Sequence, residues 1–197
     1  MRKAIFLDRD GVINELVLNH ATGEYEPPHN PRDLALCSKV LITLKTFQNA
    51  GFELFLVSNQ PDYAKGKTTL ENLQVVHAKL DEIFLADGIT FRQYYYCYHH
   101  PKGVVTSHAI QCRCRKPSPY FLLKAAQEYD IDLNLSWMIG DRDSDIACGK
   151  AAGSKTIMIE NPDSSFYRGV SHPDYSVGHI NAIIPLILQN NIDQSLT

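Results

Sequence analysis

The sequence predicts an α/β fold in which helices cover both faces of a parallel sheet, in a Rossmann-like, doubly wound arrangement. Short apolar runs alternate along the chain with segments of helical periodicity, as expected for strands joined by helical crossovers. The apolar runs are continuous, which is typical of strands buried on both faces. Hydrophobic residues make up 44% of the 197 residues, enough for one domain with a full core.

Five apolar runs are the predicted strands, and five periodic segments are the predicted helices. Gly51 and Gly153 follow two of the helices as C-terminal stops. Residues 19–33 and 161–174 are loop-like, and long loops often border active sites. The strands span residues 4–7, 52–57, 94–97, 137–139 and 156–159, and the helices span residues 34–50, 69–85, 119–129, 143–152 and 180–188.

We expect a single domain over residues 1–190, followed by a tail at 191–197. No apolar run approaches the roughly 20 residues that a bilayer span requires, and Asp8 follows the N-terminal apolar run too early for a signal peptide. A net charge of −3 without a long Lys/Arg run disfavours nucleic-acid and membrane partners. The expectation is a monomeric cytoplasmic protein that acts on a small molecule.

Polar residues directly follow three of the predicted strands. In open α/β sheets the ligand site lies beyond the carboxyl ends of the strands. Residues at these strand ends should therefore converge in space although they are distant in sequence. They are Asp8 and Asp10 after the first strand, Ser58 and Asn59 after the second, and Asp141 and Asp145 after the fourth.

Three of these carboxylates, on Asp8, Asp10 and Asp141, would raise one another's pKa values if they shared a pocket. A hard divalent cation removes that conflict, and oxygen ligands with an open position suit Mg²⁺. Two simpler interpretations stay open at this point. The first acidic pair is also compatible with an Asx-turn in which Gly11 has a positive φ, and Asp143 or Asp145 with a helix N-terminus.

The same residues supply the groups that phosphoryl transfer requires, namely a nucleophile, neutralising charge and a proton donor. Asp8 fits the nucleophile, and Asp10 fits the general acid and base. Lys116 together with Mg²⁺ fits charge neutralisation. Ser58 fits a hydrogen-bond donor to a phosphate oxygen. This pattern favours a small phosphate ester as the substrate.

Three of the five cysteines cluster with histidines, as a C-x-H pattern, a spacer of twelve residues and a C-x-C pattern. Four soft or borderline ligands around one loop suit a tetrahedral structural Zn²⁺, and the clustering favours metal binding over disulfides. The alternative is a set of free thiols beside surface histidines, and His100 and His108 are alternate ligands. The candidate ligands, in a loop over residues 97–114, are Cys97, His99, Cys112 and Cys114.

Four motifs resemble the phosphatases of the haloacid dehalogenase superfamily, and more narrowly the branch that contains heptose bisphosphate and histidinol-phosphate phosphatases. They occur in the family's order within residues 2–160. The motifs are Asp-Arg-Asp-Gly-Val-Ile-Asn at 8–14, Ser-Asn-Gln at 58–60, Cys-Arg-Cys-Arg-Lys-Pro at 112–117 and Gly-Asp-Arg-Asp-Ser-Asp at 140–145.

The resemblance implies an aspartyl-phosphate on Asp8, while Asp10 protonates the leaving alcohol and then activates water. It implies Mg²⁺ held by Asp8, by the backbone carbonyl of Asp10 and by Asp141. Asp145 supports the metal or lies in its outer shell.

The resemblance also implies how the phosphate is held. Ser58 and Lys116 hold the phosphoryl group, and Asn59 and Arg115 contact the phosphate or the rest of the substrate. The cysteine and histidine loop binds a structural Zn²⁺ in this branch. Its members lack a large cap domain, which agrees with the short chain.

Two departures from the family's pattern border the implied substrate pocket. Pro61-Asp62-Tyr63 replaces a Ser-Gly-Ile type of run, and Tyr120 replaces a glycine. They bear on the substrate, for which a heptose phosphate or bisphosphate leads and histidinol phosphate is the alternative. A phospho-acceptor signalling domain is a further alternative, against which Asp10 and the zinc loop argue. The net acidic charge argues against a nucleic-acid module.

Overall fold

A computed structural model describes residues 1–195, with the side chains of residues 1–190. Six strands form one sheet in the order β5-β4-β1-β6-β7-β8, and every neighbouring pair is parallel. The chain winds outward from β1 in both directions, so the predicted doubly wound α/β fold is confirmed. The strands are β1 (Lys3–Leu7), β4 (Phe52–Asn59), β5 (Gln93–Cys97), β6 (Trp137–Gly140), β7 (Lys155–Ile159) and β8 (Tyr175–Val177).

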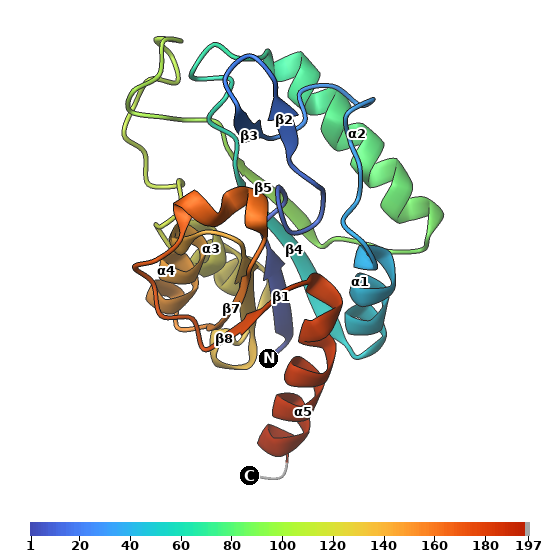
Figure 1. The fold of residues 1–197 in the computed structure, drawn as a ribbon. Helices are drawn as coiled ribbons and strands as arrows, with labels where there is room; N and C mark the ends of the chain where they lie inside the picture. Colours follow the sequence, from blue (N-terminus) through green and yellow to red (C-terminus); the bar gives the residue numbers. More distant parts are fainter. Residues whose placement is uncertain (196–197) are drawn as a thin grey trace.

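Helices cover both faces of the sheet, with α3 and α4 on one side and α1 and α5 on the other (Figure 1). None of the helices within residues 1–195 is long and apolar enough to cross a membrane. Three short 3-10 segments complete the fold. The helices are α1 (Val40–Asn49), α2 (Leu70–Ala86), α3 (Tyr120–Tyr129), α4 (Asp143–Ala152) and α5 (Ile183–Ser195), and the 3-10 segments are η1 (Leu133–Leu135), η2 (Pro162–Tyr167) and η3 (Ile180–Ala182).

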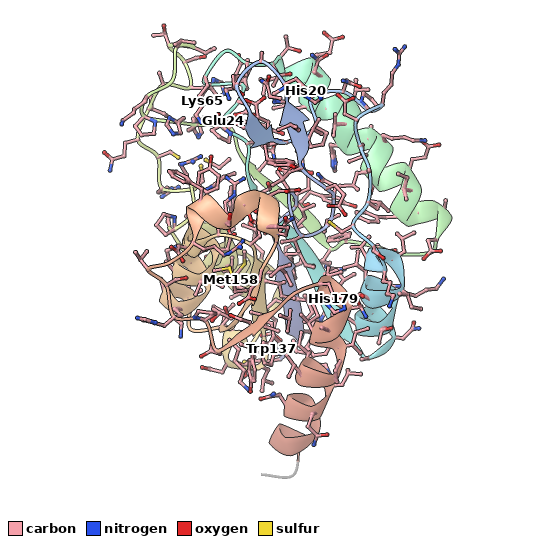
Figure 2. All side chains as sticks on the ribbon, viewed as in Figure 1. His20, Glu24, Lys65, Trp137, Met158 and His179 are labelled. Carbon is pink, nitrogen blue, oxygen red and sulfur yellow. The ribbon has the colours of Figure 1, made fainter. Side chains whose placement is uncertain are left out.

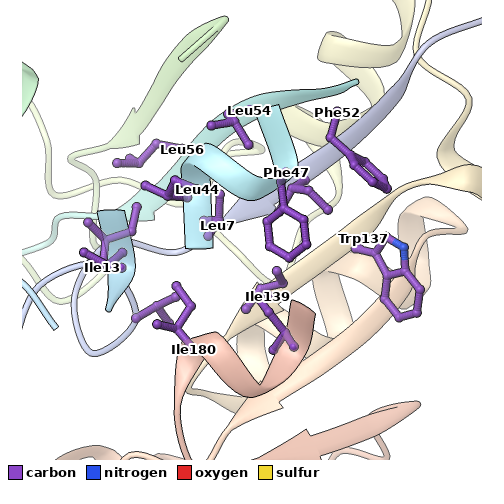
Figure 3. Packing of buried hydrophobic residues seen from close by; sticks show 14 of the residues in the cluster. Leu7, Ile13, Leu44, Phe47, Phe52, Leu54, Leu56, Trp137, Ile139 and Ile180 are labelled. Carbon is purple, nitrogen blue, oxygen red and sulfur yellow. The ribbon is translucent and has the colours of Figure 1, made fainter. Parts of the chain in front are cut away.

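The sheet separates two apolar cores. In β1, Ile5 and Leu7 face α1, α2 and α5, whereas Ala4 and Phe6 face α3 and α4. Figure 3 shows the first core, where Phe47 of α1 packs with residues of the strands. Because both faces are buried, the period-2 alternation of side chains places apolar residues at every position. This explains why the strands appear in the sequence as continuous apolar runs.

The first predicted helix begins later than expected, at Val40 instead of residue 34. Residues before it are extended and pair with the loop after β1: the Glu15 amide donates to the Ala35 carbonyl and the Cys37 amide donates to the Ile13 carbonyl, both at 2.9 Å. These tertiary hydrogen bonds override the helical periodicity. Lys39, at φ 63°, then turns the chain into α1.

Three short strands did not appear among the predicted elements. β8 extends the sheet beside β7, and β2 (Val17–Asn19) pairs with β3 (Glu24–Glu26) in an antiparallel hairpin that begins two residues before the predicted loop 19–33. Each has three residues, too few to show a period-2 pattern. The hairpin lies above the carboxyl ends of the sheet strands (Figure 1).

The end of the chain also differs from expectation. The expected tail at 191–197 begins inside α5, which continues to Ser195. The last two residues of that tail lie outside the described residues.

Gly149 allows α4 to approach the sheet closely. A Cβ atom there would lie 2.6 Å from the Met138 Cβ of β6 and 2.7 Å from the Thr156 Cγ2 of β7. Such contacts are well inside van der Waals distance, so only glycine fits without a shift. The close approach fixes the first turn of α4, which carries Asp145.

We therefore expect Gly149→Ala to destabilise the protein although alanine favours helices. Intrinsic propensity favours alanine by about 1 kcal/mol, whereas overpacking costs about 1–3 kcal/mol. Contacts of 2.6 and 2.7 Å place this site in the upper half of that range, so the expected net loss is about 1–2 kcal/mol in the free energy of unfolding, measured with urea. The matched control is Gly178→Ala, where a Cβ meets nothing within 4 Å. Equal or higher stability of Gly149→Ala would contradict the packing argument.

Candidate active site

The carboxyl ends of β1, β4 and β6 meet at one edge of the sheet, and the predicted polar residues converge there. Asp8 follows β1, and its amide donates to the Ile139 carbonyl of β6 at 2.9 Å. Asn59 ends β4, and Asp141 directly follows β6. A cavity of about 350 Å³ opens at this edge, lined by Asp8 among other residues.

Lys116 is the buried cation of this site. Its Nζ lies 2.9 Å from the Asp8 Oδ1 and 2.8 Å from the Asp145 Oδ1, and it donates to the Val57 carbonyl at 2.6 Å. Burial opposes the charged form, but the carboxylates of Asp145 and Asp8 outweigh it and raise the pKa of Lys116. The ammonium therefore stays charged and links two acidic residues.

Asp141 is the buried carboxylate that lacks such a partner. Both of its carboxylate oxygens are buried and have no hydrogen-bond donor among the described residues. Burial, followed by the charges of Asp8 and Asp145, raises its pKa to about 7. Asp8, Asp141 and Asp145 offer oxygen atoms that all lie within 4.8 Å of one another. This donor set fits a hard divalent cation, which prefers oxygen ligands.

The side chain of Asp10 has its own set of partners. Its Oδ1 accepts hydrogen bonds from Arg9 Nε at 2.9 Å and Asn14 Nδ2 at 3.1 Å, and its Oδ2 accepts one from Gln60 Nε2 at 2.5 Å. Arg9 is 1% exposed and also donates to Gln60 Oε1. Asp10 is thus held beside the acidic cluster by residues that the sequence prediction did not name. Their position inside the motifs 8–14 and 58–60 was the available signal.

The two polar residues at the end of β4 have different surroundings. Ser58 is fully buried, and Gln60 Nε2 donates to its Oγ at 2.9 Å. Asn59 lines the cavity. Its Oδ1 accepts a hydrogen bond from the Lys116 amide at 3.0 Å, and its Nδ2 donates one to the Lys116 carbonyl at 3.1 Å. The Asn59 side chain therefore fixes the backbone that carries Lys116.

The predicted zinc ligands lie together. The Sγ of Cys97 is 3.5 Å from that of Cys112 and 3.2 Å from that of Cys114, and Cys112 and Cys114 are 3.3 Å apart. His99 Nδ1 is 3.4 Å from the Cys114 Sγ. A tetrahedral Zn²⁺ with bonds of about 2.3 Å holds its sulfurs about 3.8 Å apart. The thiols are unbridged, so the cluster is compatible with a zinc site.

The two alternate histidines lie outside this cluster. His108 stacks on His99 with ring centroids 5.2 Å apart, and His100 lines the cavity. Arg115, directly after the last cysteine, also lines the cavity and donates to the His99 carbonyl at 3.5 Å. The Cys/His loop thus borders the cavity wall.

The β2–β3 hairpin forms another wall of the cavity. Glu26 forms an ion pair with Lys67, and His29 Nε2 lies 2.9 Å from the Asp62 Oδ2, so an ion pair and a hydrogen bond fasten the hairpin region to the loop after β4. Figure 2 shows Glu24 and Lys65 at this wall, far from Trp137 at the opposite end of the sheet.

Two residues that depart from the family's sequence pattern, Asp62 and Tyr120, make specific contacts in the structure. Asp62 binds His29. Tyr120 packs on Arg113, with the guanidinium carbon 4.6 Å from the ring centroid.

Comparisons with known proteins identify relatives of this chain. Residues 113–175 match the family described as HAD-hydrolase-like. A D-glycero-alpha-D-manno-heptose-1,7-bisphosphate 7-phosphatase of Photorhabdus laumondii is 33% identical over 151 residues, 77% of this chain and 78% of the relative. A D-glycero-beta-D-manno-heptose-1,7-bisphosphate 7-phosphatase of Pasteurella multocida is 31% identical over 188 residues, 95% of this chain and 97% of the relative.

A solved structure shares the fold. The D,D-heptose 1,7-bisphosphate phosphatase from B. bronchiseptica, complexed with magnesium and phosphate, has a TM-score of 0.79 and 24% identity, covering 95% of this chain and 99% of that chain. Fold and relatives define a phosphoric monoester hydrolase of the haloacid dehalogenase-like class. Within that class, the chain belongs to the family of the heptose-1,7-bisphosphate 7-phosphatases, and the resemblance found in the sequence is confirmed.

The Asp62–His29 pair gives a prediction on pH. Burial raises the pKa of Asp62, but the hydrogen bond and charge of His29 outweigh burial and lower this pKa below 3.8. A lowered native pKa stabilises the fold fully above the ordinary value, and the effect is lost as pH falls through the native pKa. We expect Asp62→Asn to lower the free energy of unfolding by about 1–3 kcal/mol at pH 6, and the difference to shrink below about pH 3.8.

Urea unfolding of both proteins between pH 6 and pH 3 measures this difference. Glu160→Gln is the matched control, because the Glu160 side chain is exposed, and its difference from the parent protein should stay small. A difference for Asp62→Asn that is independent of pH contradicts the linkage.

Proposed function

We propose that the protein is a Mg²⁺-dependent phosphatase that removes the 7-phosphate of a D-glycero-D-manno-heptose 1,7-bisphosphate through a phosphorylated Asp8. The observation that carries this proposal is the buried Asp8 beside Lys116 and the unpartnered Asp141. The substrate follows from the names of the relatives. Since these names include both the alpha and the beta anomer, the anomer is left to experiment.

Asp8 begins the proposed reaction by attacking phosphorus. One carboxylate oxygen forms a bond to phosphorus while the bond from phosphorus to the sugar oxygen breaks. Lys116 neutralises charge beside Asp8, at 2.9 Å in the free protein. Asp8, Asp141 and the Asp10 carbonyl, with Asp145 in support, would hold Mg²⁺, which would supply further positive charge when bound. Ser58, Asn59 and Arg115 are proposed to hold the phosphate or the sugar.

Asp10 carries the proton in both half-reactions. Its carboxylic acid donates a proton to the leaving sugar oxygen, and the resulting carboxylate then takes a proton from water. That water attacks the aspartyl-phosphate at phosphorus, the bond from phosphorus to the Asp8 oxygen breaks, and inorganic phosphate leaves with the Asp8 carboxylate restored. Arg9, Asn14 and Gln60 orient the Asp10 side chain throughout, because each donates a hydrogen bond to its carboxylate.

The Zn²⁺ at Cys97, His99, Cys112 and Cys114 is proposed to be structural. Four protein ligands close the coordination sphere, whereas a catalytic zinc keeps one position open. The loop directly precedes Arg115 and Lys116, so the metal holds in place the segment that presents both cations. We also propose that the enzyme acts as a monomer, since one chain supplies the whole set of residues named above.

A substrate panel tests the proposed function. We expect phosphate release from the 7-position of the heptose bisphosphate with a kcat/KM at least about tenfold above that for histidinol phosphate or other sugar monophosphates. Both anomers are compared in parallel. Asp8→Asn should lower kcat by about a thousandfold or more, because the nucleophile is lost. Glu160→Gln is the control with full activity.

Two outcomes of this panel would count against the proposal. Undiminished Mg²⁺-dependent turnover by Asp8→Asn contradicts the role of Asp8. A preference for histidinol phosphate contradicts the substrate.

Elemental analysis tests the zinc site. Protein purified without chelator should contain about one zinc per chain, as four protein ligands suffice for one ion. Cys112→Ser should lose the metal and lower turnover by roughly tenfold or more, because Arg115 and Lys116 are then less well placed. Cys37→Ser is the matched control, since this free cysteine lies outside the cluster. Zinc-free protein, or full activity of Cys112→Ser, contradicts the structural role.

A further inference from the structure

The segment after β7 is tied to both loops that carry the catalytic carboxylates. Asn161 Nδ2 donates to the Gly11 carbonyl at 3.0 Å, which links the segment to the loop after β1. Arg168 Nη1 donates to the Asn161 carbonyl at 2.7 Å and to the Asp141 carbonyl at 3.3 Å. The sequence predicted a loop here, whereas the structure contains η2 between these two anchors.

The far end of the segment is fastened as well. The Asp143 carboxylate accepts hydrogen bonds from the backbone amides of Val170 at 3.0 Å and Ser171 at 3.1 Å. Asp143 belongs to the first turn of α4, directly beside the active-site loop. The segment therefore has a defined position relative to Asp8 and Asp141.

Tyr167, the last residue of η2, lies against Arg142. The Arg142 guanidinium carbon is 4.2 Å from the centroid of the Tyr167 ring. Both side chains line the same cavity as Asp8. Arg142 is 28% exposed, and its Nε is buried without a hydrogen-bond partner among the described residues.

The stacked geometry determines what Arg142 can bind. An aromatic ring that covers one face of a guanidinium leaves the N–H donors in its plane free. The nearest carboxylate oxygen to the Arg142 Nε, the Asp141 Oδ1, is 3.9 Å away, beyond hydrogen-bond distance. Arg142 lines the cavity and is partly exposed, so it offers its positive charge and its donors other than the buried Nε to an anionic or hydroxyl-bearing ligand there.

We propose that Tyr167 is a positioning residue that holds the Arg142 guanidinium against the cavity, and that this stacked pair sets the affinity for the substrate. The inference rests on the proposed phosphatase function and deepens it. Tyr167 does not take part in proton transfer, so its loss acts on KM and not on kcat. The aromatic ring is the required feature, and the hydroxyl is not.

Steady-state kinetics with the heptose bisphosphate compare Tyr167→Leu with Tyr167→Phe. We expect Tyr167→Leu to raise KM about three- to thirtyfold, the range of one cation–π contact, with kcat nearly unchanged. Tyr167→Phe should keep the parent KM because it retains the ring. The control is Phe166→Leu, since Phe166 is 91% exposed and its loss should change neither constant.

A double-mutant cycle tests whether Tyr167 acts through Arg142. Arg142→Gln should raise KM at least as much as Tyr167→Leu does, and adding Tyr167→Leu to it should have little further effect. The proposal is overturned if the KM of the double variant rises by the product of the two single increases. It is also overturned if Tyr167→Leu, like Phe166→Leu, leaves KM unchanged.

Binding to the Asp8→Asn background separates this proposal from the proposed function. The Kd of the heptose bisphosphate is measured there by calorimetry, without turnover, and the Tyr167→Leu change should weaken it as it raises KM. Unchanged binding overturns the role of Tyr167 even if the enzyme is a phosphatase. If the bisphosphate does not bind at all, both the proposed substrate and the proposed role of Tyr167 in its affinity fail. Turnover of another phosphate ester would still support the phosphatase chemistry.

Discussion

The ion pairs of Lys116 are the interaction on which the site depends. Three carboxylates, on Asp8, Asp141 and Asp145, are gathered in a buried space, where like charges destabilise one another. One lysine between Asp8 and Asp145 offsets part of that cost. It leaves the local charge negative and Asp141 without a partner. The unbalanced charge is the physical reason that the site suits a divalent cation.

The position of Lys116 is in turn fixed from two directions. Asn59, at the end of β4, holds the Lys116 amide and carbonyl with two hydrogen bonds. The Cys/His loop ends at Cys114, two residues before Lys116, and its thiols are gathered closely enough to share one ion. The sheet and the loop therefore act on the same backbone. This would link the proposed structural metal to Lys116 in the candidate active site.

The sequence was sufficient for the parts of the molecule that follow local periodicity or strand ends. Buried strands produce continuous apolar runs, and parallel strands bring Asp8, Ser58 and Asp141 to one edge of the sheet. The start of α1 and the β2–β3 hairpin were not predictable in this way. They depend on hydrogen bonds between distant segments, such as Cys37 to Ile13, which leave no periodic signal.

The hydrogen-bond partners of Asp10 and the proposed role of Tyr167 were likewise not predictable from the sequence. Gln60 and Arg9 stand in recognisable motifs, but their orientation toward Asp10 is a property of the packed site. Tyr167 lies in a segment without periodicity, and only its contact with Arg142 distinguishes it from a surface residue. Sequence patterns thus identify the reacting groups more readily than the groups that hold them.

The charges around the cavity also explain why Pro61-Asp62-Tyr63, which replaces the family's usual run, leaves the anion-binding groups in place. Glu26 and Asp62 are acidic, and free carboxylates at a phosphate pocket would repel the substrate. Here Glu26 forms an ion pair with Lys67, and Asp62 forms a hydrogen bond with His29, so both carboxylates are already engaged in the contacts that fasten the hairpin. Arg115 and Arg142 have no ion-pair partner within 3.5 Å among the described residues, so their positive charges can act on a ligand, although one Arg115 donor is engaged by the His99 carbonyl. The substituted loop at 61–63 thus shapes the wall of the pocket. The cations that line the pocket continue to favour an anionic substrate.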